Sequence, residues 1–78
     1  MTAKEMFELL GYKQSTFISM LEYENVEIGR TILFMKNDEK KHEFKGVNIA
    51  STDKGFALSV ELLNAINQQL KELGWLDE

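Results

Sequence analysis

The side chains that could perform acid–base or nucleophilic chemistry are few, and their spacing does not assemble a site. His42 is the only histidine in the 78 residues and cysteine is absent, so one chain supplies neither a two-histidine metal set nor a thiolate. Ser51 and Thr52 carry hydroxyls, but nothing in the sequence pairs either with a base and an acid. We therefore expect no catalytic residue, no cofactor and no metal site, and interpret the protein as a non-enzyme.

The other familiar patterns for acid–base, phosphate and calcium sites are also missing. Glu22, Glu24 and Glu27 cluster around Tyr23, but carboxylates at a strand end and in a loop are usually solvated rather than held in a desolvated cleft. The five glycines are isolated, which excludes a glycine-rich phosphate loop. Residues 37–39 lack the alternating oxygens and the closing glutamate of a calcium loop.

One stretch of the chain is rich in lysine, with Lys36, Lys40, Lys41 and Lys45. A hairpin there could contact phosphates while Phe34 or Phe44 stacks on bases, although lysines on an edge strand also prevent edge-to-edge aggregation. The net charge of −4 opposes nonspecific binding to nucleic acid, which needs a basic surface. A nucleic-acid-associated protein is therefore the alternative reading, and an acidic decoy for a DNA-binding protein is a third and weaker one.

Two amphipathic helices are predicted at the ends of the chain. Thr2 with Glu5 has the spacing of a capping box, and Ser59 is the expected N-cap of the second helix. The expected inward residues are Ala3, Met6, Phe7 and Leu10 in the first helix and Leu63, Ile66, Leu70 and Leu73 in the second. Gly11 and Gly74 end the helices in a left-handed conformation, so the aromatic that follows each should pack back on the last turn, Tyr12 on Phe7 and Trp75 on Leu70.

Three strands are predicted between these helices, over residues 15–23, 28–36 and 41–47. The polar residues 37–40 suit a hairpin loop, Phe44 is expected to face the core, and Gly46 is expected to mark a bulge. The prediction is an α+β fold, with a helix, a three-stranded antiparallel meander and a helix. Both helices lie on one face of the sheet, and residues 1–78 form a single small domain.

The first two predicted strands carry apolar residues on both faces. Ile18, Met20, Leu33 and Met35 would lie on the face opposite the helices. Either this face is a self-association or docking surface, or the sheet twists strongly and residues 48–56 fold over it. Trp75 is a further candidate anchor for a partner, because tryptophan is favoured at binding hot spots.

Two segments, MTAKEMFELLGY at Met1–Tyr12 and LSVELLNAINQQLKELGWL at residues 58–76, resemble small proteins encoded by phages and prophages of Gram-positive bacteria. In those proteins a helix ending in Leu-Gly-Tyr or Leu-Gly-Phe opens the chain, and one ending in Glu-Leu-Gly-Trp closes it. Leu62 departs from the pattern, since many of them have glutamate there. The resemblance implies a small fold without assigned catalytic residues.

We therefore expect a non-enzymatic protein-interaction module whose partner is a phage or host protein, with a homodimer as one form of that interaction. The N-terminal segment has no apolar run typical of a signal peptide. The longest apolar runs are four residues, far short of a membrane span. A location in the cytoplasm of a bacterial host, without membrane contact, is the expectation that fits.

Overall fold

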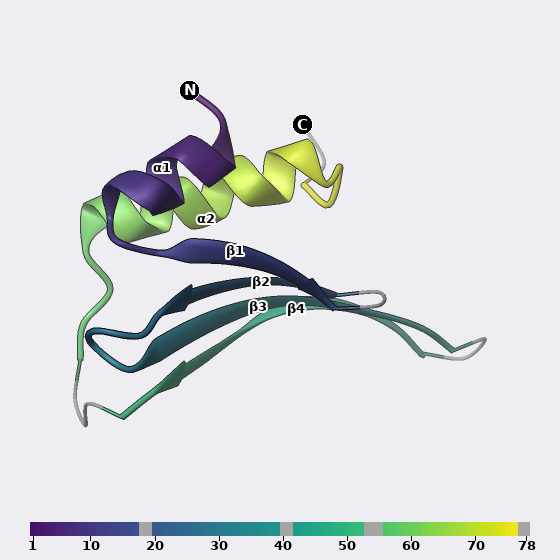
Figure 1. Cartoon of the computed structure of the whole chain (residues 1–78). Helices are drawn as coiled ribbons and strands as arrows, with labels where there is room; N and C mark the ends of the chain where they lie inside the picture. Colours follow the sequence, from purple (N-terminus) through teal and green to yellow (C-terminus); the bar gives the residue numbers. More distant parts are fainter. Residues whose placement is uncertain (18–19, 40–41, 53–55, 77–78) are drawn as a thin grey trace.

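The computed structural model describes residues 1–17, 20–39, 42–52 and 56–76. The elements in chain order are α1 (Ala3–Leu9), β1 (Lys13–Phe17), β2 (Met20–Asn25), β3 (Arg30–Glu39), β4 (His42–Ser51) and α2 (Val60–Glu72). The four strands pair antiparallel in the order β1-β2-β3-β4. Figure 1 shows α1 and α2 together over one face of this sheet, with the β3–β4 hairpin extending beyond them. The predicted α+β class and the placement of both helices on one face are confirmed.

The number of strands was wrong, since the sheet has four rather than three. The stretch 15–23, expected as one strand, belongs to β1 and β2, which pair so that Phe17 lies opposite Met20. The alternation of apolar and polar residues in this stretch does not indicate that it contains two strands. The stretch also lacks the glycine or asparagine residues that are typical of a tight hairpin. The polar residues 37–39, expected as loop, are paired within β3 and β4.

Both helices end as the sequence predicts. The Thr2 hydroxyl accepts from the Glu5 N–H at 3.2 Å while the Glu5 carboxylate accepts from the Thr2 N–H at 2.8 Å, which completes the capping box. After α1, Gly11 has φ 91° and the Tyr12 N–H donates to the Phe7 carbonyl at 2.9 Å. The same pattern follows α2, where Gly74 has φ 73° and the N–H of the next residue donates to the Leu70 carbonyl at 3.0 Å.

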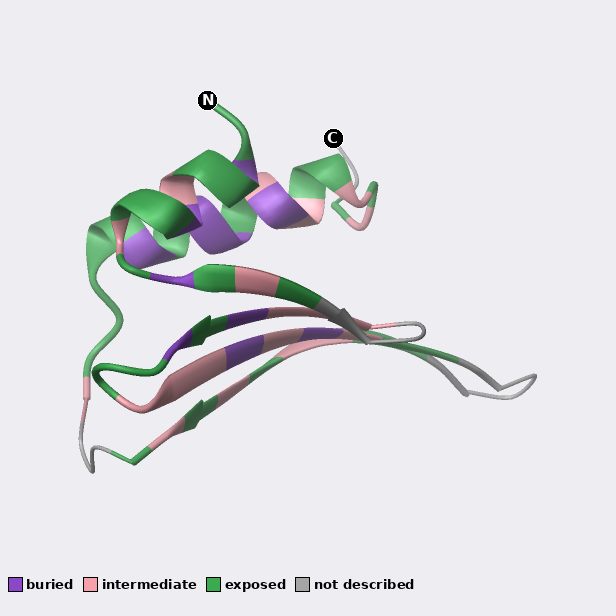
Figure 2. Cartoon of the chain, viewed as in Figure 1, coloured by how far each residue is buried: buried purple, intermediate pink, exposed green. Residues whose placement is uncertain are grey.

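An aromatic cluster fills the space between the helices and the sheet. Phe7 stacks on Tyr23 with ring centroids 3.9 Å apart, and it meets Tyr12 and Phe34 edge-on at 5.7 and 6.3 Å. Figure 2 shows the buried residues on the facing sides of the helices and of the central strands. Because such pairs stabilise by about 0.5–1.5 kcal/mol beyond their buried area, this cluster fixes how the helices sit on the sheet.

Of the four α2 residues predicted to point inward, Ile66, Leu70 and Leu73 do pack in or against the core, and only Leu63 does not. Leu62, Ala65, Ile66 and Gln69 are the buried residues of this helix, whereas Leu63 is 42% exposed. Leucine occupies both 62 and 63, so apolar periodicity alone leaves the phase of the helix ambiguous. The helix is turned so that Gln69 is buried, and there the Gln69 side chain accepts a hydrogen bond from the Tyr23 hydroxyl.

A carboxylate ties the far ends of the chain together. Glu72, at the end of α2, accepts from the Ala3 N–H at 2.8 Å and from the Gln68 amide at 3.0 Å. The start of α1 therefore lies beside the end of α2, and a negative charge at a helix N-terminus is favourable. No helix in the described ranges is long and apolar enough to cross a membrane.

Candidate functional site

The open face of the sheet is the surface that the sequence singled out as a candidate interface. Side chains along a strand point alternately to its two faces, and Tyr23, Ile32 and Phe34 point toward the helices, where they are buried. Their neighbours Leu33 and Met35 therefore point the other way, and both are only partly buried. Figure 1 shows that neither helix covers this side of the sheet.

The strand register brings the predicted interface residues together. Leu33 lies opposite Glu22 on β2, and Met35 lies opposite Gly46 on β4. Leu21 pairs with Phe34, so antiparallel register places Met20 beside Met35. Ile18, the remaining residue predicted on this face of the sheet, lies outside the described residues.

Phe44 belongs to this surface, which contradicts the prediction that it faces the core. It is 55% exposed. Val47 and Ile49 lie an odd number of residues further along β4, so they point to the other face of the sheet, where they pack against the core. Gly46 forms no bulge, because its pairing with Met35 continues the register of the hairpin. A Cβ on Gly46 would lie 2.5 Å from the Phe44 Cζ, so the phenyl ring lies over the glycine.

We call Met20, Leu33, Met35 and Phe44 the open-face patch. Its border along β2 is acidic: Glu22 lies beside Leu33 in the register and accepts from the Ser15 hydroxyl of β1 at 2.8 Å. Glu24, exposed on the same face, lies opposite Lys13. The patch is therefore an apolar area with two carboxylates along one side, the outer of which has Lys13 beside it.

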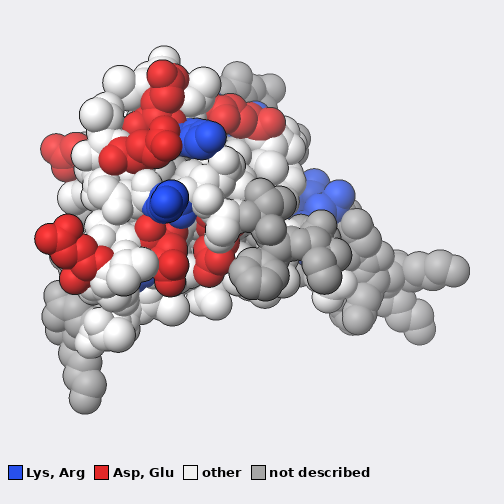
Figure 3. Space-filling model, in the orientation of Figure 1, with Lys and Arg blue, Asp and Glu red and all other residues white. Residues whose placement is uncertain are grey.

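Only part of the alternative site, the lysine-rich hairpin, lies within the described residues. Lys36 and Lys45 lie opposite each other on β3 and β4 and are exposed, while Lys40 and Lys41 lie outside the described residues. Phe34 is 1% exposed, and alternation places Phe44 on the other face of the hairpin from both described lysines. The described surface in Figure 3 carries many acidic groups over the helices and the nearby strands, interrupted by single basic ones.

Trp75 lies in the helix layer, away from the open-face patch. It is partly buried and packs against the core, and its N–H bonds to the Leu70 carbonyl. This position agrees with the predicted role of the aromatic in ending α2. Because part of the Trp75 side chain is exposed, it stays a candidate anchor for a partner protein.

Sequence reasoning missed the polar groups of the core. Tyr23 donates to Gln69 and its hydroxyl lies 3.5 Å from the Gln14 amide, which donates to it. Burial, together with the negative charge of Glu72, raises the pKa of Tyr23 to about 12. Asn25, 7% exposed, donates to the Leu10 carbonyl at 3.4 Å. Polar residues of this kind carry no periodic signal, because their burial depends on partners distant in the sequence.

Two hollows open on the described surface. One, of about 220 Å³, lies between the helices and is lined by Met1, Met6, Leu9, Leu10, Glu61 and Asn64. The other, of about 110 Å³, includes Tyr12, Arg30 and Ser59 in its lining. Among the described residues, no three histidine or acidic side chains gather closely enough to hold a metal ion.

Comparison of the chain with protein-family models, with curated proteins and with solved structures finds no match. A function for this chain therefore has to be inferred from the residues on its surface.

Proposed function

We propose that this protein is a non-enzymatic interaction module that binds another protein through the open-face patch. The supporting observation is that Met20, Leu33, Met35 and Phe44 share the sheet face that neither helix covers, with Phe44 55% exposed. Burying such a patch against a partner is favourable by about 25 cal/mol per Å² of apolar surface. Methionine and aromatic side chains are also enriched in the centres of protein interfaces.

The surroundings of the patch indicate the chemistry of that partner. Glu22 and Glu24 border the apolar residues, and the whole chain carries a net charge of −4. A partner with an apolar centre and a basic rim would complement this surface. A second copy of the chain is the less favoured occupant, because two like net charges repel.

The resemblance of the terminal segments to phage and prophage proteins supports a partner of phage or bacterial host origin, and hence a role in the bacterial cytoplasm. The experiment is affinity capture from such a host with three forms of the protein: the original chain, Met35→Asp and Leu9→Asp. Leu9 is 73% exposed on α1 and far from the patch in the fold, which makes it the matched control.

We expect one protein to be captured by the original chain and by Leu9→Asp but not by Met35→Asp, with the melting temperatures of all three within a few degrees. Its binding should weaken with added salt, since exposed charges are screened beyond about 8 Å at 0.15 M ionic strength. Equal capture by Met35→Asp would contradict the proposal.

Two other outcomes would favour a different partner or a different site. A dimer in sedimentation equilibrium that Met35→Asp dissociates would make a second copy the occupant. Salt-sensitive binding of an oligonucleotide, lost in Lys40→Ala/Lys41→Ala, would favour the lysine-rich hairpin instead.

A further inference from the structure

The smaller hollow lies on the helix-covered side of the sheet, beneath the first turn of α2. Its lining residues are Leu10, Tyr12, Ile28, Arg30, Ser59 and Leu62, and its volume is about 110 Å³. Of these residues Arg30 alone carries a charge, whereas the chain as a whole carries −4. The described lining of the hollow is therefore basic, on a protein whose net charge is negative.

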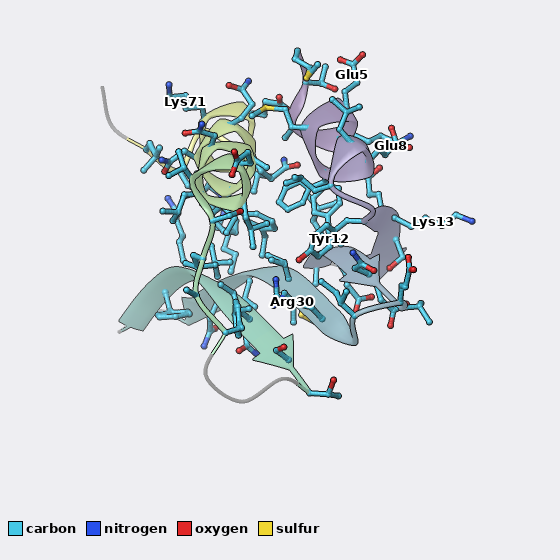
Figure 4. The ribbon with its side chains drawn as sticks, turned by 90° about the vertical axis from the view of Figure 1, so that its left-hand side faces the viewer. Glu5, Glu8, Tyr12, Lys13, Arg30 and Lys71 are labelled. Carbon is cyan, nitrogen blue, oxygen red and sulfur yellow. The ribbon has the colours of Figure 1, made fainter. Side chains whose placement is uncertain are left out.

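Two polar atoms here are buried and have no hydrogen-bond partner in the described part of the chain: the Tyr12 hydroxyl and the Arg30 Nε. Tyr12 is only 5% exposed. A buried polar group left unsatisfied costs about 1–3 kcal/mol, so most buried polar atoms have a partner, which is protein, water or a ligand. Figure 4 shows both side chains in the layer between the helices and the sheet, whereas Glu5, Glu8 and Lys71 lie on the outside of the helices.

The Arg30 side chain is held in place by an aromatic neighbour. Its Cζ lies 3.9 Å from the centroid of the Phe56 ring, which is a cation–π contact. Its backbone is held in β3 between Asn25 and Ser51. The guanidinium presents its N–H donors in a planar fork, and that fork matches a carboxylate in a two-bonded arrangement.

The start of α2 adds to the attraction for an anion. The Ser59 hydroxyl, at the lip of the hollow, accepts from the Leu62 N–H at 3.1 Å. The other N–H groups of the first turn have no acceptor within the helix. The positive end of the helix dipole favours a negative group at this position.

We propose that this hollow, the Arg30 pocket, binds a carboxylate carried on a short aliphatic stem. The carboxylate accepts from the Arg30 guanidinium and the Tyr12 hydroxyl, and the stem lies against Leu10, Ile28 and Leu62. Either a free short-chain carboxylic acid or the C-terminal carboxylate of a peptide provides this chemistry. The pocket and the open-face patch lie on opposite sides of the sheet, so the two proposals stand or fall separately.

The test is a titration of the ¹⁵N-labelled chain with propionate, followed by NMR, with propionamide as the uncharged analogue. We expect saturable shifts confined to the amides around Tyr12, Arg30 and Ser59, and none with propionamide. Tyr12→Phe should weaken propionate about tenfold, since a hydrogen bond to a charged group is among the stronger ones. It should not lower the melting temperature, because the hydroxyl has no partner in the described fold.

Arg30→Gln should weaken propionate at least as much, while Lys13→Gln, which removes an exposed charge outside the pocket, should not change it. Shifts that do not saturate, an equal response to propionamide, or unchanged affinity in Tyr12→Phe would overturn the proposal and leave water as the partner of the two buried atoms. A short peptide ending in alanine separates the two sources: binding about tenfold tighter than propionate, and lost on amidation, assigns a peptide terminus. Equal binding assigns a free acid.

Discussion

The two faces of the sheet are made by alternate residues of the same strands, yet they differ in what covers them. Tyr23, Ile32 and Phe34 are 0–1% exposed beneath the helices. Leu33 and Met35, their neighbours in β3, are only partly buried, on the face that neither helix covers. The strands thus carry apolar residues on both sides while the chain supplies helices for one. We interpret the covered face as the one that stabilises the fold and the open face as the one that binds.

The largest effect is expected from Phe7→Ala, which removes the centre of the aromatic cluster. Phe7 is 0% exposed and contacts three other rings. A buried phenylalanine truncated to alanine costs about 3–5 kcal/mol, a large share of the stability of a domain of this size. Met35→Ala on the open face should cost about 1 kcal/mol or less. Urea denaturation compares the two, and equal losses would show that both faces hold the fold.

A smaller effect is expected from Tyr23→Phe, which keeps the ring stacked on Phe7 but leaves the buried Gln69 amide without its donor. The cost should be about 1–3 kcal/mol. The pKa of Tyr23 is raised from 10.0 to about 12 by burial and by Glu72, so above pH 10 the unfolded chain releases this proton before the folded chain does. The contribution of Tyr23 to the free energy of unfolding should therefore be fully present below pH 10 and be lost between pH 10 and 12.

Tyr23→Phe lacks that component, so its free energy of unfolding should decline less steeply over the same interval. Denaturation at a series of pH values, with Tyr12→Phe as the control, measures the difference. Parallel curves for Tyr23→Phe and the original chain would show that burial does not raise the pKa of Tyr23.

The smallest effects are expected at two glycines, one constrained and one open. Gly29 has φ 64°, and a Cβ there would overlap the Thr52 side chain, so Gly29→Ala should cost about 1–2 kcal/mol. At Gly46 the obstacle is the exposed ring of Phe44, which can swing into solvent, so Gly46→Ala should stay within about 0.5 kcal/mol. Thermal melts distinguish them. A large loss at Gly46 would mean that the Phe44 ring is held in place.

Local signals predicted the helices better than the sheet. The caps at Thr2 and Ser59 and the stops at Gly11 and Gly74 involve residues within a few positions of each other, so the sequence pattern contains the whole interaction. The hairpin between β1 and β2 was missed because residues 15–23 alternate through the reversal. Phe44 was assigned to the wrong face because the phase of β4 is set by its pairing with β3, which no local pattern encodes.

For the candidate sites too, local features were predictable and contacts between distant segments were not. Met20, Leu33 and Met35 were predicted on the face away from the helices because strand alternation is local, and register then brought them together. The Arg30 pocket was not predictable, since Tyr12, Arg30 and Ser59 come from three separate segments that meet only when α2 packs on the sheet.

The most direct test of the account asks whether the open face is uncovered in solution. The chain has four methionines, and each methyl group gives its own NMR signal. A soluble gadolinium chelate should attenuate the methyl signals of Met20 and Met35 strongly and those of the buried Ile32 and Ile66 weakly. Attenuation of Met20 and Met35 as slight as that of the two isoleucines would contradict the account, because it would show that this chain or a second copy already covers the face we assign to a partner.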